Sequence, residues 1–242
     1  MQTSNDLQST FSRAFALLTA NWVIVVPGVV VSLLALIVGV FFTAGAIGSY
    51  AVANGGAAGI VGAALMGLIG AAVVLLLTIA QLAYITGMAA QAWETGSATL
   101  VEGARAFAQR GPALLLLLIL LFVIGLVAMV LAPFTLFLSL LAYGFFFMYA
   151  IPGVVIGNEE ATIALSESGR LAWRNLAPSL IILIAVAFVS FLGHFIGMLF
   201  GVIPVIGTLI GLLIGQVAVA YGALVVVGEY LKLRQEPPVA PQ

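Results

Sequence analysis

Charged side chains divide the chain into three long uncharged stretches. Residues 14–93, 111–158 and 175–228 contain no Asp, Glu, Lys or Arg, and their apolar runs are continuous. Continuous runs favour membrane-spanning helices over barrel strands, because barrel strands alternate apolar and polar positions. A spanning helix needs about 20 apolar residues, so each stretch is long enough for a pair of spans.

Each stretch is interrupted near its middle by residues that favour turns. The interruptions are the Gly- and Ala-rich segment 49–62, the pair Ala132-Pro133, and the segment 201–204, which ends in a proline. The sequence therefore predicts six helices, at about 22–48, 62–92, 112–131, 135–156, 177–201 and 205–230. Segment 49–62 is long for a turn, and it fits either a loop or a re-entrant piece.

A similar short segment precedes each predicted pair of spans. The letters RAFA stand at 13–16 and 105–108, and the looser match RLAW stands at 170–173. In the first segment, apolar residues at helical spacing define one face, formed by Leu7, Phe11, Phe15 and Leu18. We interpret the three segments as amphipathic helices at the membrane interface, with plain polar connectors as the alternative.

The predicted fold is all-α: a polytopic membrane helix bundle of six transmembrane helices, arranged as three hairpins that each follow an interfacial helix. The chain then forms one transmembrane domain, 1–242, with pseudo-repeats at 5–92, 97–156 and 160–231 and a short tail at 232–242. Internal repeats are common in transporter folds. Chance similarity within such an apolar composition is the alternative explanation.

All seven basic residues fall on one side of this six-span arrangement. The three turns on the other side carry no charge of either sign. The positive-inside rule therefore predicts that the charged side, with both termini, faces the cytoplasm across the inner membrane. Trp22, Trp93 and Trp173 lie near the charged segments, as an aromatic belt at the interface would.

The composition agrees with a membrane location. Hydrophobic residues make up 64% of the chain and charged residues 6%, whereas soluble domains are about 25% charged. This excludes a soluble fold, and with a net charge of −1 it excludes a nucleic-acid partner. The chain has no cysteine, which excludes disulfides and thiolate metal sites.

One segment resembles a known family. The stretch 149–175 contains YAIPGVV, then Glu159-Glu160, then ALSESGRL at 164–171, then Asn175. It resembles the signature of six-span bacterial and archaeal membrane domains, which include the membrane domain of some glycerophosphodiester phosphodiesterases and uncharacterised inner-membrane proteins. The phosphodiesterase catalytic domain is absent, so the resemblance implies no hydrolase activity. It implies a membrane-embedded domain linked to lipid or envelope processes.

Small residues recur every four positions in the last two predicted spans. Gly193, Gly197 and Gly201 form one row, and a second row is formed by Gly207, Gly211 and Gly215. Residues four apart share a helix face, so each row predicts a groove where another backbone approaches closely. The simpler interpretation is that these two spans pack together. The alternative is an interface with a second copy or a partner membrane protein.

Polar side chains inside spans are costly and are therefore candidates for function. Gln81 and Gln216 occupy matching positions near mid-span, and either a polar cavity or a hydrogen bond between helices would explain them. His194, the one histidine, lies in the outer half of the fifth span. Without a nearby carboxylate it predicts a packing role better than a metal or proton site.

The sequence contains no phosphate-binding loop, HExxH motif or nucleophile elbow. We therefore predict no catalytic, metal-ligating or cofactor-binding residue, and a non-enzymatic protein. The predicted role is that of a scaffold or accessory protein, or a role in lipid or envelope homeostasis, with membrane lipids and a second copy or partner membrane protein as contacts. The alternative is a transporter or channel for a small molecule or lipid, with a polar site at mid-membrane.

Overall fold

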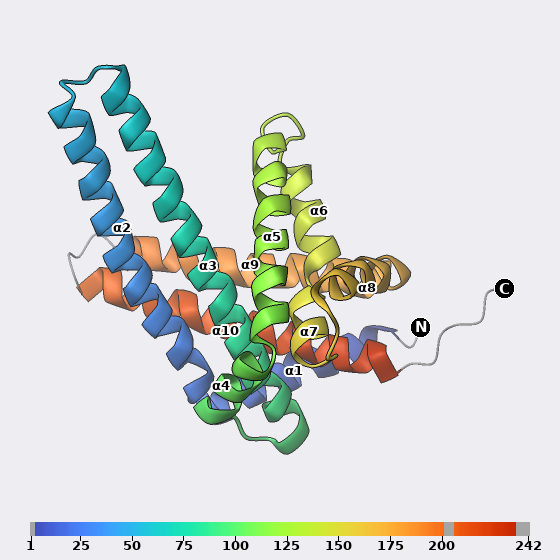
Figure 1. Cartoon of the computed structure of the whole chain (residues 1–242). Coiled ribbons are helices and arrows are strands. Elements are labelled where there is room, and N and C mark those ends of the chain that lie inside the picture. Colours follow the sequence, from blue (N-terminus) through green and yellow to red (C-terminus); the bar gives the residue numbers. More distant parts are fainter. Residues whose placement is uncertain (1–2, 201–205, 236–242) are drawn as a thin grey trace.

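A computed structural model describes residues 3–200 and 206–235, and every regular element in these ranges is a helix (Figure 1). The elements in chain order are α1 (Thr3–Ala20), the 3-10 helix η1 (Trp22–Val25), α2 (Val26–Val52), α3 (Ala57–Thr95), α4 (Leu100–Gln109), α5 (Gly111–Leu131), α6 (Leu138–Phe147), α7 (Ala150–Val155), α8 (Ala161–Arg174), α9 (Leu176–Phe200) and α10 (Ile206–Gln235).

Six apolar helical segments are long enough to cross a membrane, which confirms the predicted all-α membrane fold. They are Trp22–Val52, Ala57–Thr95, Gly111–Leu131, Leu138–Val155, Leu176–Phe200 and Gly207–Gln235. At 1.5 Å per residue, the 39 residues of α3 extend about 58 Å, well beyond a hydrocarbon layer of about 30 Å. The chain is a multi-pass membrane protein, and α3 is long enough to cross the apolar layer at a tilt or to continue past it.

The segment 49–62 is mostly helical, so the predicted end at 48 and start at 62 were wrong. α2 continues to Val52 and α3 begins at Ala57, with Asn54 (φ 47°) and Gly55 (φ 71°) in the left-handed region between them. Only four residues connect the helices, which leaves no room for a re-entrant piece. The small residues allow close packing instead, because a Cβ at Gly59 would lie 3.1 Å from the Tyr50 Cα atom.

The fourth predicted helix, 135–156, is divided in two. α6 ends at Phe147 and α7 begins at Ala150. Pro152 explains the break, because proline has no N–H to donate to the carbonyl four residues earlier. A serine from α8 bonds to the interrupted backbone: Ser168 Oγ accepts from the Tyr149 N–H at 3.1 Å and donates to the Phe146 carbonyl at 2.7 Å.

Short helices precede three of the spans at the predicted places, as α1, α4 and α8. The Thr99 hydroxyl caps α4 by accepting from the Glu102 N–H at 3.3 Å. The predicted apolar face of α1 was partly wrong, because Phe15 is 61% exposed whereas Thr10 and Ala14 are fully buried. A polar side chain therefore lies on the buried face of α1, and a phenyl ring on the open face.

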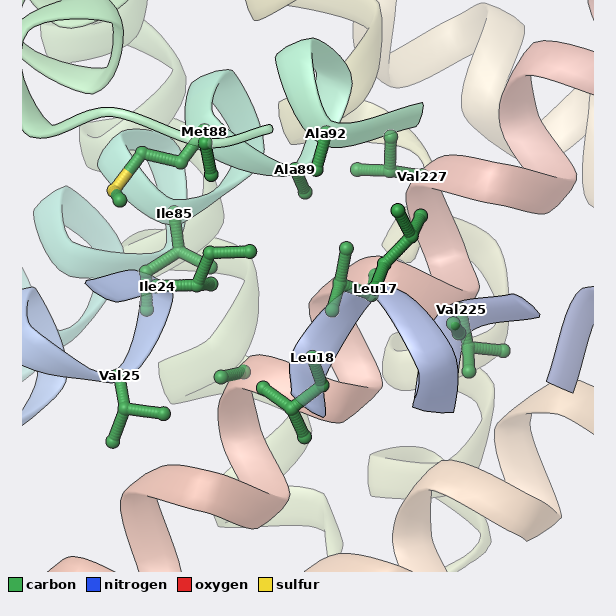
Figure 2. Packing of buried hydrophobic residues seen from close by; sticks show 14 of the residues in the cluster. Leu17, Leu18, Ile24, Val25, Ile85, Met88, Ala89, Ala92, Val225 and Val227 are labelled. Carbon is green, nitrogen blue, oxygen red and sulfur yellow. The ribbon is translucent and has the colours of Figure 1, made fainter. Parts of the chain in front are cut away.

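The largest hydrophobic core lies where α1 and η1 meet the C-terminal halves of α3 and α10. Figure 2 shows Leu17 and Leu18 from α1 and Val225 and Val227 from α10 in this core. In Figure 1 the far ends of α2 and α3 extend beyond the rest of the molecule. In the same view α9 and α10 run across α5. α10 continues to Gln235, so the residues predicted to begin a tail at 232 are helical, and residues 236–242 lie outside the described part.

Candidate functional site

Three polar side chains from three helices form a hydrogen-bonded chain between apolar surfaces. Gln81 Nε2 of α3 donates to Gln216 Oε1 of α10 at 2.6 Å. Gln216 Nε2 in turn donates to Ser32 Oγ of α2 at 2.7 Å. Gln81 is 4% exposed. The two glutamines that the sequence singled out are therefore direct partners, and α2 contributes a third member that the sequence did not indicate.

A glycine makes room for this chain. Gly28 is buried near the start of α2, and a Cβ built on it would overlap Gln216 Oε1 and lie 3.0 Å from Gln81 Nε2. Any side chain at this position would therefore displace the amide of Gln216. The absence of a Cβ brings the α2 backbone against the two amides, which lowers the exposure of the polar groups to lipid.

An apolar groove of about 510 Å³ lies beside the glutamines, between α2, α3 and α4. Its walls include Val30 and Val31 of α2, Gln81 and Tyr84 of α3, and Phe107 of α4. The Tyr84 hydroxyl donates to the Leu100 carbonyl at 2.5 Å, which ties α3 to the first turn of α4. The groove therefore presents mainly hydrocarbon, with one amide in its wall.

The glycine rows differ in their contacts. Gly197 and Gly211 meet directly, because a Cβ on either would lie 2.9 Å from the Cα atom of the other. Gly193 lies beside Ala218, at 3.0 Å from an added Cβ to the Ala218 Cβ, whereas an added Cβ on Gly215 would meet nothing within 4 Å. Gly207 is buried, and Gly201 lies outside the described residues. The close approach of α9 and α10 thus centres on one pair of glycines.

His194 lies apart from these groups. It is exposed on α9, and its Nδ1 bonds to the carbonyl of Ser190 in the preceding turn at 2.7 Å. This contact belongs to its own helix, so the structure does not bring His194 to the glutamines. Among the residues that the structure describes, no three His, Asp or Glu side chains gather as metal ligands would.

A cavity of about 180 Å³, with charged side chains in its lining, lies where α8 meets the end of α10, and sequence reasoning missed it. Arg234 donates to the Gly157 carbonyl at 3.2 Å and to the Tyr230 hydroxyl at 3.3 Å. The Tyr230 hydroxyl bonds to the Glu159 carboxylate. Burial raises the pKa of Glu159, the Arg234 charge opposes this rise, Glu167 adds to it, and the Tyr230 bond lowers it.

Glycine again provides the space. A Cβ on Gly153 would lie 2.9 Å from Glu159 Oε2, and one on Gly157 would lie 2.5 Å from the Tyr230 hydroxyl. Several residues of the stretch 149–175 therefore line this cavity. Within that stretch, the letters PG at 152–153 and SES at 166–168 were the sequence features that could have indicated it. The aromatic and basic partners from α10 are some 70 positions away, and no local pattern predicts them.

A second group of charged side chains joins α1 to the ends of α3 and α10. Arg13 donates to the Trp93 carbonyl at 2.8 Å, and Lys232 donates to Thr10 Oγ1 at 2.5 Å. Glu229 is only 5% exposed and accepts from Thr10 Oγ1 at 3.4 Å. A buried carboxylate needs such partners, because desolvation penalises its charged form.

Comparison with known proteins gives no relative: no family model, no curated protein and no solved structure matches the chain. The resemblance of residues 149–175 to the six-span family therefore stays a prediction.

Proposed function

We propose that this chain is a non-enzymatic inner-membrane protein, with both termini in the cytoplasm, that acts as a scaffold or accessory component in lipid or envelope processes. The observation that carries the proposal is that the polar side chains within the spans form hydrogen bonds with groups of the protein itself. Gln216 bonds to both Gln81 and Ser32, and among the described residues no buried side-chain nitrogen or oxygen lacks a partner. Polar groups that satisfy one another serve helix association rather than the binding of a solute.

The contacts between charged segments support the orientation. Arg13 of α1 reaches the end of α3, and Lys232 and Arg234 of α10 reach α1 and the segment before α8. Helix α4 also joins this region, since the Thr99 N–H donates to Gln91 Oε1 of α3 at 2.8 Å. The charged segments are therefore neighbours at one end of the spans, as the positive-inside rule requires of cytoplasmic segments.

The relative direction of α3 and α10 also supports the proposed arrangement of six spans. α3 contacts α10 through Gln81 with Gln216, and twelve residues later through Trp93, whose Nε1 donates to the Leu224 carbonyl at 2.9 Å and whose ring lies beside Gly228. The two helices therefore run in the same direction. The second and sixth spans of a chain that crosses six times have this relation.

The surface of the outer helices supports a role in contacts with lipid or protein. Large hydrophobic side chains are exposed along α2, α3, α5 and α9, for example Ile37, Ile69, Val127 and Phe191. In a membrane such faces contact acyl chains or other helices. A scaffold requires surface of this kind, whereas a transporter requires a water-accessible path.

Extraction into polymer discs directly from native membranes tests the proposal. We expect the chain to be retained with a second copy or a partner membrane protein and with a defined set of lipids, as judged by the mass of the disc and its contents. A chain that is recovered as a single copy, with the same lipids as empty discs, would contradict the scaffold role.

A second candidate is a transporter of amphipathic molecules, which the groove beside Gln81 favours. Proteoliposomes distinguish the two. The scaffold role predicts that lipid scrambling and solute flux equal those of protein-free vesicles. Flux that depends on the protein, and that Gln81→Leu abolishes while the fold is retained, would establish transport instead.

A further inference from the structure

A pocket of about 460 Å³ opens where α1 meets the ends of α3 and α10. Its polar lining consists of two cationic side chains, three hydroxyls and an indole ring, from Arg13, Lys232, Ser9, Thr10, Ser12 and Trp93. No acidic residue is among the described residues that line it. The pocket is separate from the glutamine chain and from the cavity at Glu159.

Arg13 is held in position by the tryptophan. Its Nη2 donates to the Trp93 carbonyl, and its guanidinium carbon lies 4.6 Å from the centroid of the Trp93 ring. A guanidinium has five N–H donors in a planar fork, so this bond leaves others for an anion on the exposed side. Trp93 itself is fixed by its bond to the Leu224 carbonyl.

Lys232 supplies the second charge from α10. Its Nζ lies 2.5 Å from Thr10 Oγ1 and 3.4 Å from Ser9 Oγ, so the ammonium is at the α1 side of the pocket. Glu229 offsets part of this charge, but it is buried behind Thr10 and does not line the pocket. The charged side chains among the described residues that line the pocket, Arg13 and Lys232, are both basic.

We propose that this pocket binds a phosphate group, with the phosphodiester of an anionic membrane lipid as the ligand. The Arg13 guanidinium and the Lys232 ammonium are charged N–H donors of the kind that proteins use for phosphate oxygens. The pocket lies at the ends of two spans, where lipid headgroups lie. Phe15 of α1 and Trp22 of η1 are 61% and 58% exposed, and on these elements they offer apolar surface to acyl chains. This inference deepens the proposed function and rests on its membrane placement.

Lipid retention by the full-length protein tests the proposal. The detergent-purified protein is given equal amounts of phosphatidylglycerol and phosphatidylcholine, and the retained lipids are counted by native mass spectrometry. Each basic residue near a membrane surface changes anionic-lipid affinity about fivefold. We therefore expect a preference for phosphatidylglycerol that falls roughly 25-fold in the R13Q/K232Q double variant.

Two further variants test whether a loss of lipid preference comes from the pocket itself, rather than from a general loss of positive charge or from misfolding. R105Q/R170Q removes two exposed arginines outside the pocket, each paired with a glutamate one turn away, and should keep the preference. Ser12→Asp introduces a negative charge into the lining while leaving the Arg13 contacts in place, and should lower the preference about fivefold. Equal loss in R105Q/R170Q, or an unchanged preference in Ser12→Asp, would overturn the proposal.

Inorganic phosphate at matched ionic strength distinguishes the lipid from the free ion. We expect it neither to displace phosphatidylglycerol nor to stabilise the protein at millimolar concentration. Displacement would overturn the lipid assignment. The two proposals fail in different experiments. If the pocket does not bind lipid, the lipid preference is lost but the oligomers and partners found in native discs are unchanged. If the scaffold role is wrong, the discs contain a single copy but the lipid preference remains.

Discussion

The amide of Gln81 donates to the amide oxygen of Gln216 at 2.6 Å, although 135 positions separate the two residues. The bond joins the second span to the sixth, and Ser32 extends it to the first. In a layer where water supplies no alternative partner, this contact sets which helices are neighbours. It is also the point at which a scaffold and a transporter differ most, because a transporter would expose these amides to solute.

A double-mutant cycle tests the glutamine pair. Gln81→Leu and Gln216→Leu should each destabilise the protein, and the double variant should lose less than the sum, because one bond accounts for both effects. The expected coupling is roughly 0.6–2 kcal/mol, measured by reversible unfolding in bicelles. Additive effects would mean that the bond does not form in the membrane. Gln91→Leu serves as the control. Gln91 lies near the end of α3, outside the core of the spans, and accepts a hydrogen bond from the Thr99 N–H.

The glycine contact between α9 and α10 predicts a position-specific effect. Gly211→Leu should destabilise the fold by about 1–3 kcal/mol, because the new side chain would occupy the space of the Gly197 backbone. Gly215→Ala, in the same row, should not destabilise the fold, since nothing lies within 4 Å of the added Cβ and alanine favours a helix more than glycine does. Thermal unfolding in detergent compares the two. Equal sensitivity at both positions would contradict the observed packing.

The broken fourth span predicts a role for one serine. Ser168→Ala should cost about 1–3 kcal/mol, because the buried Tyr149 N–H would lose its acceptor. Ser166→Ala is the matched control on the same helix, since the Ser166 hydroxyl is exposed and bonds only within its own turn. Chemical unfolding of both variants tests this prediction. If Ser168→Ala leaves the free energy of unfolding unchanged, the break in the fourth span needs no hydrogen bond from α8.

Glu159 predicts a dependence on pH. Its pKa is raised above the usual 4.5, mainly by burial, so the folded chain keeps this proton to higher pH than the unfolded chain. The associated stability is therefore present below 4.5 and is lost as pH rises through the folded pKa. Relative to Glu159→Gln, the free energy of unfolding of the natural protein should fall as the pH rises above 4.5. A constant difference, or one that grows with pH, would contradict the raised pKa.

Much of the fold could be predicted because the bilayer imposes one strong constraint. Charge is excluded from the hydrocarbon, so the positions of Arg13, Glu94 and the other charged residues defined three uncharged stretches. The turn-favouring residues within those stretches then predicted six spans. Details set by packing could not be predicted in this way. Asn54 and Gly55 were visible as turn residues, but the helical state of Gly59 and Gly62 depends on close contact with α2.

The candidate sites were predictable only in part. The matching positions of Gln81 and Gln216 indicated two related residues, whereas their direct bond depends on the path of α10 beside α3. Pro152 was a sequence signal for the break in the fourth span that the expected helix 135–156 did not use. The partner that repairs the break, Ser168, comes from another helix, so no local pattern could identify it.

The most direct test of the account measures which side of the membrane the charged segments face. The chain has no cysteine, so single cysteines can be introduced without a background. Ala57→Cys and Phe134→Cys lie at the uncharged turns, and Ser97→Cys and Ser166→Cys lie among the charged segments. In intact spheroplasts a membrane-impermeant maleimide should label the first two and not the second two, and all four should react after permeabilisation. Labelling of S97C or S166C from outside would contradict the proposed arrangement of the six spans.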